Sequence, residues 1–311
     1  MSHYIARRLV QMIPVVFGIT MLLFFMLRLI PGDPASVMLG ERATDAAVER
    51  INHELGLDQP IYVQYGYFLR DLATLNLGTS IKYQVPVAEL LGQRLLVSFS
   101  VVGVTLVLTI VIAFPLGVLA ALKKDSLIDN VVRAIFVVLM LMPSFWVGIL
   151  LIIFFSVQLG LFPVSGYGSG LLDTLHHLFL PALTIALAIT PVLVRALRSS
   201  ILDALSADYV RTARAKGLRE RAVITANVLR NALIPAITLL GLSIGSLMGG
   251  TVILEKVFAL PGAGALLIDS IGARDYPVVQ AATMVFATMV ILVNLLTDIV
   301  YSFLDPRVRY G

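Results

Sequence analysis

Apolar positions gather in long runs along most of this chain, and polar positions separate one run from the next. Six of the runs hold about 20 or more mostly apolar residues, the length that an α-helix needs to cross a bilayer. They are Leu9–Ile30, Leu95–Leu122, Val131–Gly160, Phe179–Ser199, Leu233–Leu254 and Val278–Leu304. The pattern therefore predicts an all-α integral membrane protein with six transmembrane helices.

The composition agrees with a membrane protein. Of the 311 residues, 59% are hydrophobic and 14% are charged, whereas soluble domains have about half and about a quarter. The chain has no cysteine, which excludes disulfides and thiolate chemistry. Arg7 and Arg8 precede the first apolar run as in a signal peptide, but the run is too long and no small-residue cleavage site follows. We expect this run to be a retained anchor.

Lysine and arginine lie mainly in connections on one side of the expected membrane. These are Arg7 and Arg8, then Lys123, Lys124 and Arg133, the segment 208–231, and Arg307 and Arg309. The loop between the third and fourth runs has neither residue type, and the last loop has only Lys256 and Arg274. Because Lys and Arg accumulate in short cytoplasmic loops, both termini should be cytoplasmic. The net charge of +4 therefore reflects topology rather than nucleic-acid binding.

The segment from Pro31 to Arg94 should lie outside the cell membrane as a packed cap. The sequence PGDP at residues 31–34 predicts a turn, Thr44 should begin a short helix that ends at Gly56, and Pro60 should open another. We expect three regions: residues 1–93 with the first helix and the extracytoplasmic loop, residues 94–304 with a five-helix core, and a cytoplasmic tail at 305–311.

The fifth run contains Gly241–Gly245, GLSIG, which has the spacing of a serine hydrolase motif. Ser243 would need a base, but the four histidines, His3, His53, His176 and His177, all lie outside the runs. Gly241, Gly245 and Gly249 recur every four residues, so we expect them to form a helix-packing face rather than part of an intramembrane protease.

Two other polar groups invite a functional interpretation. His176 and His177 with Asp173 are too few, and neighbouring residues on a helix point apart, so no metal site is expected. Asn294 and Asp298 share one face of the sixth run. They either make a helix contact near the cytoplasmic end or line a solute pathway.

The basic segment Asp208–Asn231 reads DYVRTARAKGLRERAVITANVLRN. Ser206 is a suitable N-cap, Lys216 falls in the last turn, and Gly217 is the natural stop, so the segment should begin with a short helix. A second helix should follow until Pro235 introduces the fifth span. Ala213 and Ala215 are small, which would let a partner surface approach the first helix.

This segment resembles a motif of the membrane subunits of binding-protein-dependent ABC importers, whose fourth-to-fifth loop carries E-A-A, three residues, then G. Arg211, Thr212, Ala213 and Gly217 stand in the corresponding places, so the last alanine and the glycine match. Pro235 comes later than the general form has it. DYVRTARAKGL and LRNALIP look like the version found in dipeptide, oligopeptide, glutathione and nickel permeases. RLIPGDPA, LGLDQP, EKVFALPGAGALLIDSI and DPRVRYG resemble the B-type member of that permease pair.

The resemblance implies a type I ABC importer permease in a bacterial inner membrane, embedded in lipid and passing it several times. It implies a C-type permease partner, two cytoplasmic ATPase subunits that bind ATP and Mg, and a periplasmic binding protein. The residues implied to couple to the ATPase are Asp208, Tyr209, Arg211, Thr212, Ala213, Arg214, Ala215, Lys216 and Gly217. The chain has no G-x-x-x-x-G-K-[ST] loop, so it should not be an enzyme itself.

Some alternatives stay open at this point. A stand-alone secondary transporter would be expected to show internal repeats and charges near the midplane, and the sequence shows neither a repeat nor many such charges. The basic segment could also bind anionic lipid headgroups. The solute could be a dipeptide, an oligopeptide, glutathione or a nickel complex, because selection should lie largely in the binding protein.

Overall fold

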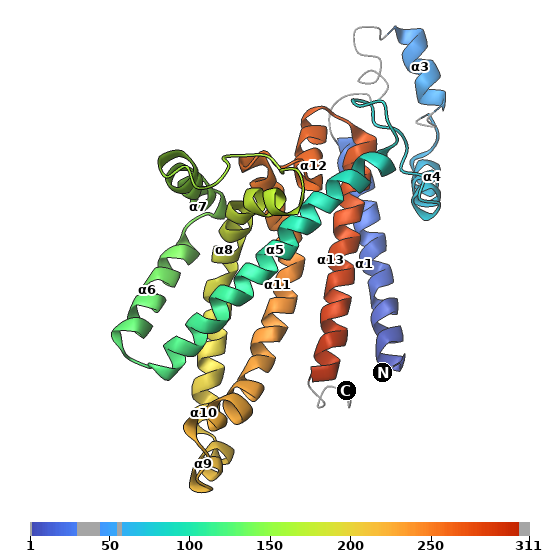
Figure 1. Ribbon diagram of the computed structural model, residues 1–311. Helices are drawn as coiled ribbons and strands as arrows, with labels where there is room; N and C mark the ends of the chain where they lie inside the picture. Colours follow the sequence, from blue (N-terminus) through green and yellow to red (C-terminus); the bar gives the residue numbers. More distant parts are fainter. Residues whose placement is uncertain (1, 30–43, 55–57, 305–311) are drawn as a thin grey trace. The chain divides into compact units, whose positions relative to one another are not determined.

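The computed structural model describes residues 2–29, 44–54 and 58–304 (Figure 1). Within these ranges the regular elements are helices joined by turns and loops, and one isolated bridge pairs Thr79 with Pro86. The predicted turn at residues 31–34, the predicted stop at Gly56 and the tail at 305–311 lie outside them. The helices form two compact units. One comprises Met1–Val97 with Pro261–Ile291, and the other Ser98–Leu260 with Leu292–Gly311.

The first unit contains α1 (Ser2–Leu29), α3 (Asp45–Glu54), α4 (Ile61–Ala73), the start of α5 (Val87–Leu122), α12 (Ala263–Gly272) and the first part of α13 (Tyr276–Leu304). Thr44 precedes α3 and Pro60 precedes α4, as predicted. Phe24 of α1 is buried against Tyr65 and Phe68 of α4. The aromatic residues of α4 thus hold it against α1.

A buried carboxylate fixes the connection between α4 and α5. Asp275, at the start of α13, accepts hydrogen bonds from the Ser80 hydroxyl and from the backbone N–H groups of Ile81 and Lys82. Its side chain is fully buried, and these donors offset the loss of its hydration. The segment before α5 is therefore packed.

The second unit is built around α8 (Leu171–Ser206), which packs against α11 (Arg230–Val257). The rest of α5, α6 (Leu127–Leu141) and α7 (Ser144–Leu151) also belong to it, as does the π-helical η2 (Ile152–Gln158). Ala113 and Ala120 of α5, Val132 and Phe136 of α6, and Leu193 and Val194 of α8 share one apolar core.

The third predicted span, Val131–Gly160, was wrong as a single continuous helix. The structure breaks it after Leu141 and bends the two parts by 109°. Pro143 has no N–H to continue α6, and it drives Met142 into an extended conformation with ψ 132°. The chain restarts as α7 at Ser144. Pro143 itself was the sequence signal for this break.

In the described part of the chain, four helices are long and apolar enough to span a membrane, or five if the bent pair counts as one. The apolar part of α1, Val10–Met26, is shorter. The largest differences from the predicted runs are at two helix starts, since α5 begins at Val87 rather than Leu95 and α8 at Leu171 rather than Phe179. A helix can continue beyond its apolar run because its backbone N–H and C=O groups stay hydrogen-bonded to each other when the side chains become polar.

Candidate functional site

The predicted basic segment forms the connection between α8 and α11, at the lower end of α8 in Figure 1. Its first helix, α9, spans Asp208–Ala215. Ser206 was predicted to cap it, and this was wrong. Ser206 is instead the last residue of α8, where its hydroxyl donates to the Asp203 carbonyl. Ala207 holds the N-cap position in an extended conformation, without a side-chain cap.

Gly217 ends α9 as predicted. Its φ of +75° is in the left-handed region, which glycine enters without steric cost. The Gly217 N–H donates to the Arg214 carbonyl at 2.9 Å, and the Leu218 N–H points to the Ala213 carbonyl at 3.4 Å. These bonds satisfy carbonyl groups at the end of the helix and turn the chain back.

One face of α9 packs inside the protein. Val210 and Ala213 are buried with Leu197 and Ile201 of α8 and with Val223 beyond the turn. The prediction that Ala213 leaves room for a partner was therefore wrong: positions three apart share a helix face, and the chain itself covers this one. Ala215 is exposed. The same apolar cluster holds α9 firmly from behind.

The other positions of α9 and of the turn after it are exposed, and they mix aromatic, apolar and basic groups. Tyr209 is 43% exposed, and Leu218, just after the turn, is 49% exposed. Also exposed are Asp208, Arg211, Thr212, Lys216, Arg219 and Arg221. Arg211 lies 3.5 Å from Asp208, but an ion pair this exposed adds little stability. We call the set Tyr209, Arg211, Thr212, Ala215, Lys216 and Leu218 the open face of α9.

Arg214 braces the turn after α9. Its Nη2 and Nε atoms donate to the two carboxylate oxygens of Glu220, at 2.6 and 3.1 Å. This hydrogen bonding raises the pKa of Arg214 above its ordinary value, so the guanidinium stays charged. Glu220 begins the short α10 (Glu220–Ala222), and the paired fork fixes the direction in which the chain leaves α9.

The second predicted helix does not stop at Pro235. After α10, the π-helical η3 (Val223–Leu229) leads without a break into α11, and Pro235 lies inside α11. Because proline has no N–H, one backbone hydrogen bond of the helix is missing there. The helix nevertheless continues through Pro235. The wider turns of η3 had no sequence signal that we recognised.

The three predicted packing glycines lie in different surroundings. A Cβ atom at Gly241 would lie 2.6 Å from Cγ2 of Thr297, so α11 and α13 approach very closely there. Gly245 is buried. Gly249 is exposed, and a Cβ atom there would have nothing within 4 Å. In the part of the chain that the structure describes, Gly241 is thus the glycine of this set with a tight helix contact.

The other candidate residues have ordinary structural surroundings where the structure describes them. Ser243 donates to the Leu239 carbonyl one turn earlier. Asn294 is exposed on α13, and the side chain of Asp298 lies outside the described residues. His176 bonds to the Leu161 carbonyl and His177 to the Asp173 carbonyl. The described residues include no group of three or more His, Cys, Asp or Glu that could hold a metal.

Besides Asp275, two further buried carboxylates were missed from the sequence. Glu255 of α11 is fully buried and accepts a hydrogen bond from Ser98 of α5 at 2.6 Å. Asp129 of α6 is also fully buried and pairs with Arg198 of α8. The available signal was a carboxylate at the edge of an apolar run, which needs a partner if it is buried. The partners are far away in the sequence, so periodicity could not identify them.

Comparisons with known proteins point in one direction. The family model described as "Binding-protein-dependent transport system inner membrane component" matches residues 113–310, and the model of its N-terminal part matches residues 1–117. The chain is 41% identical to the oligopeptide transport system permease protein AppB of Bacillus subtilis, over the whole length of both. It is 38% identical to the glutathione transport system permease protein GsiC of Escherichia coli, again over both whole chains.

Two solved structures share the fold. A chain of the MetNI methionine ABC transporter in an inward-facing conformation has a TM-score of 0.58 at 18% identity, covering 71% of this chain and 98% of that one. A chain of an amino acid ABC transporter has a TM-score of 0.52 at 16% identity, covering 69% and 94%. The arrangement of helices is therefore that of ABC transporter chains.

Proposed function

Because the chain belongs to the family of binding-protein-dependent transport system inner membrane components, we propose that it forms one half of an ATP-driven import pathway for short peptides. The observation that carries this is the match to peptide permeases along its full length. A permease of this kind has no catalytic role of its own. The energy would come from two ATPase subunits that bind ATP and Mg, and a periplasmic binding protein would deliver the solute.

The proposed substrates are short peptides of a few residues. Relatives are named as oligopeptide, peptide and glutathione permeases, at nearly equal identity of 41%, 42% and 38%. Glutathione is itself a tripeptide, so one class of substrate covers all three names. These near-equal identities favour no single member of the class.

We extend the proposal to six spans in a bacterial inner membrane with both termini on the cytoplasmic side. The close contact of Gly117 on α5 with Leu197 on α8 supports this side assignment. The contact lies in the C-terminal part of both helices, which supports a position on one side for the basic turn at Lys123 and Lys124 and for α9. Positive charge gathered on one side of a membrane protein marks the cytoplasm.

The open face of α9 would be the surface that meets the ATPase. It offers Tyr209 and Leu218 as apolar anchors within a rim of arginine and lysine, which is the composition of a protein-binding surface. The buried cluster behind α9 lets a push on this face move α8 as well. ATP-driven closure of the ATPases would then switch the pore between outward and inward openings.

Substitutions at Gly217 test this docking. Both Ala and Trp would be strained at φ +75°, at a cost of about 1 to 2 kcal/mol. Nothing in the chain lies within 4 Å of the position of a Cβ atom, so the chain itself has room for the ring. We expect Gly217→Ala to retain the ATPase subunits on purification and Gly217→Trp to lose them. Equal retention in both variants would place the docking surface elsewhere.

A further inference from the structure

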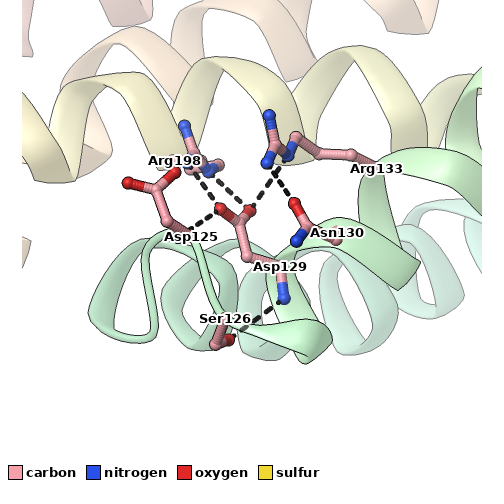
Figure 2. Close-up of polar contacts among 6 residues, drawn as sticks. All are labelled: Asp125, Ser126, Asp129, Asn130, Arg133 and Arg198. Atoms are coloured by element: carbon pink, nitrogen blue, oxygen red, sulfur yellow. Dashed lines mark hydrogen bonds and ion pairs between the residues drawn. The ribbon is translucent and has the colours of Figure 1, made fainter.

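A single buried carboxylate joins three elements of the second unit. Arg198 of α8 donates to both oxygens of Asp129, from Nε to Oδ1 at 2.8 Å and from Nη2 to Oδ2 at 2.7 Å. The backbone N–H of Asp125, in the turn after α5, donates to Oδ2 at 3.0 Å. Arg133 places its Nε 3.5 Å from Oδ1. Figure 2 shows these groups converging on Asp129.

The contribution of this ion pair to folding stability does not by itself explain why the chain has it. Close to the pair, Val132 and Phe136 of α6 already pack with Leu193 and Val194 of α8. A buried ion pair loses the hydration of both charges, so apolar side chains of similar volume often stabilise a core as well or better. The bidentate fork fixes the geometry of the contact, because α6 cannot rotate or slide on α8 without breaking two short hydrogen bonds to a buried carboxylate.

Arg198 also stands next to the contact between α8 and α9. Leu197 and Ile201, on either side of it, belong to the apolar cluster that buries Val210 and Ala213 of α9. From Arg198, α8 continues without interruption to Ser206, about 12 Å further along the axis at 1.5 Å per residue. Only Ala207 separates that end from α9. A displacement of α9 is therefore carried by α8 to the level of the ion pair.

We infer that Asp129 and Arg198 form a transmission contact, which makes α6 and the α5–α6 turn follow α8 when the ATPases move α9. This rests on the proposed function, since it takes α9 as the driven element. The pair is a positioning device and does not touch the solute. Loss of the Asp129–Arg198 pair should leave the fold of α9 and its docking to the ATPase intact. The displacement of α9 would then still move α8, but α6 would not follow.

The test is the amount of peptide taken up per ATP hydrolysed, measured with the whole complex and its binding protein in proteoliposomes. In Arg198→Lys, a single ammonium replaces the planar fork and cannot hold both oxygens in the same way. In the double variant Asp129→Leu with Arg198→Met, an apolar pair fills the site without any charge. For the double variant we expect the ATPases to stay bound and uptake per ATP to fall about tenfold. Arg198→Lys should fall between it and the wild type.

Arg133→Gln is the matched control, because Arg133 is half-exposed and lies farther from the same carboxylate. It should keep wild-type uptake per ATP. Normal uptake per ATP in the double variant would overturn the inference, and so would failure of that variant to assemble, since the pair would then act in folding. If the wild-type complex binds no ATPase and shows no ATP-dependent uptake, the proposed function fails instead, which is a different result.

Discussion

Among the individual residues of the site, Ala213 differs most from what its sequence motif predicts. In the motif it is a small residue beside a partner, whereas in the structure it is 7% exposed and packs with Val223 and Val228. A small residue suits position 213 of this chain because its own helices meet there. Ala215, two positions later, points away from the cluster and is exposed. The two alanines should therefore respond very differently to a charge.

Glutamate at each alanine separates folding from docking. Ala213→Glu would bury an unpaired carboxylate and should destabilise the α9 region by about 3 kcal/mol or more, so that limited proteolysis cuts the loop faster. Ala215→Glu should leave the proteolysis pattern unchanged and weaken ATPase binding. Equal protease resistance of the two variants would contradict the burial of Ala213.

Local chemistry explains which residues were predictable. The left-handed stop at Gly217 follows from that residue alone, and the structure has it. The pair of Asp129 with Arg198 joins positions 69 residues apart, so no local pattern contains it. The same holds for Glu255 with Ser98, which are 157 residues apart. Long-range polar pairs depend on how the helices meet.

At the scale of elements, the apolar runs predicted where helices lie but not their interruptions. Hydropathy depends on composition over about 20 residues, so it passes over the bend at Pro143 and the π-helical η2 and η3. It also passes over Pro235, which α11 accommodates. The length of an apolar run predicts the length of a span. Bends and π-helical turns within the span depend instead on the backbone hydrogen bonding at a few positions.

Helix contacts at this scale can be tested with glycine substitutions in α11. Gly241→Ala would place a methyl group 2.6 Å from Thr297 Cγ2 and should lower stability by about 1 to 3 kcal/mol. Gly249→Ala meets open space and should be neutral or slightly stabilising. Thermal unfolding of the purified protein in detergent measures both. A larger loss for Gly249→Ala would show that α11 is packed in a different register.

For the whole molecule, orientation in the membrane is the first property to establish. Reporter fusions at Gly166 and Leu266 should report the outside, and fusions at Asp125 and Arg214 the cytoplasm, because the basic connections belong inside. Accessibility assays in intact cells would measure this. A cytoplasmic signal at Gly166 would contradict both the six-span arrangement and the position proposed for α9.

The central claim is that this chain imports peptides only as part of an ATP-driven assembly. The most direct measurement is uptake of a labelled short peptide into proteoliposomes, with binding protein outside and ATP supplied on the side of α9. We predict accumulation with the complete complex, and none when ATP or the ATPase subunits are left out. Accumulation by this chain alone, driven by an ion gradient without ATPases, would contradict the account and identify a secondary transporter.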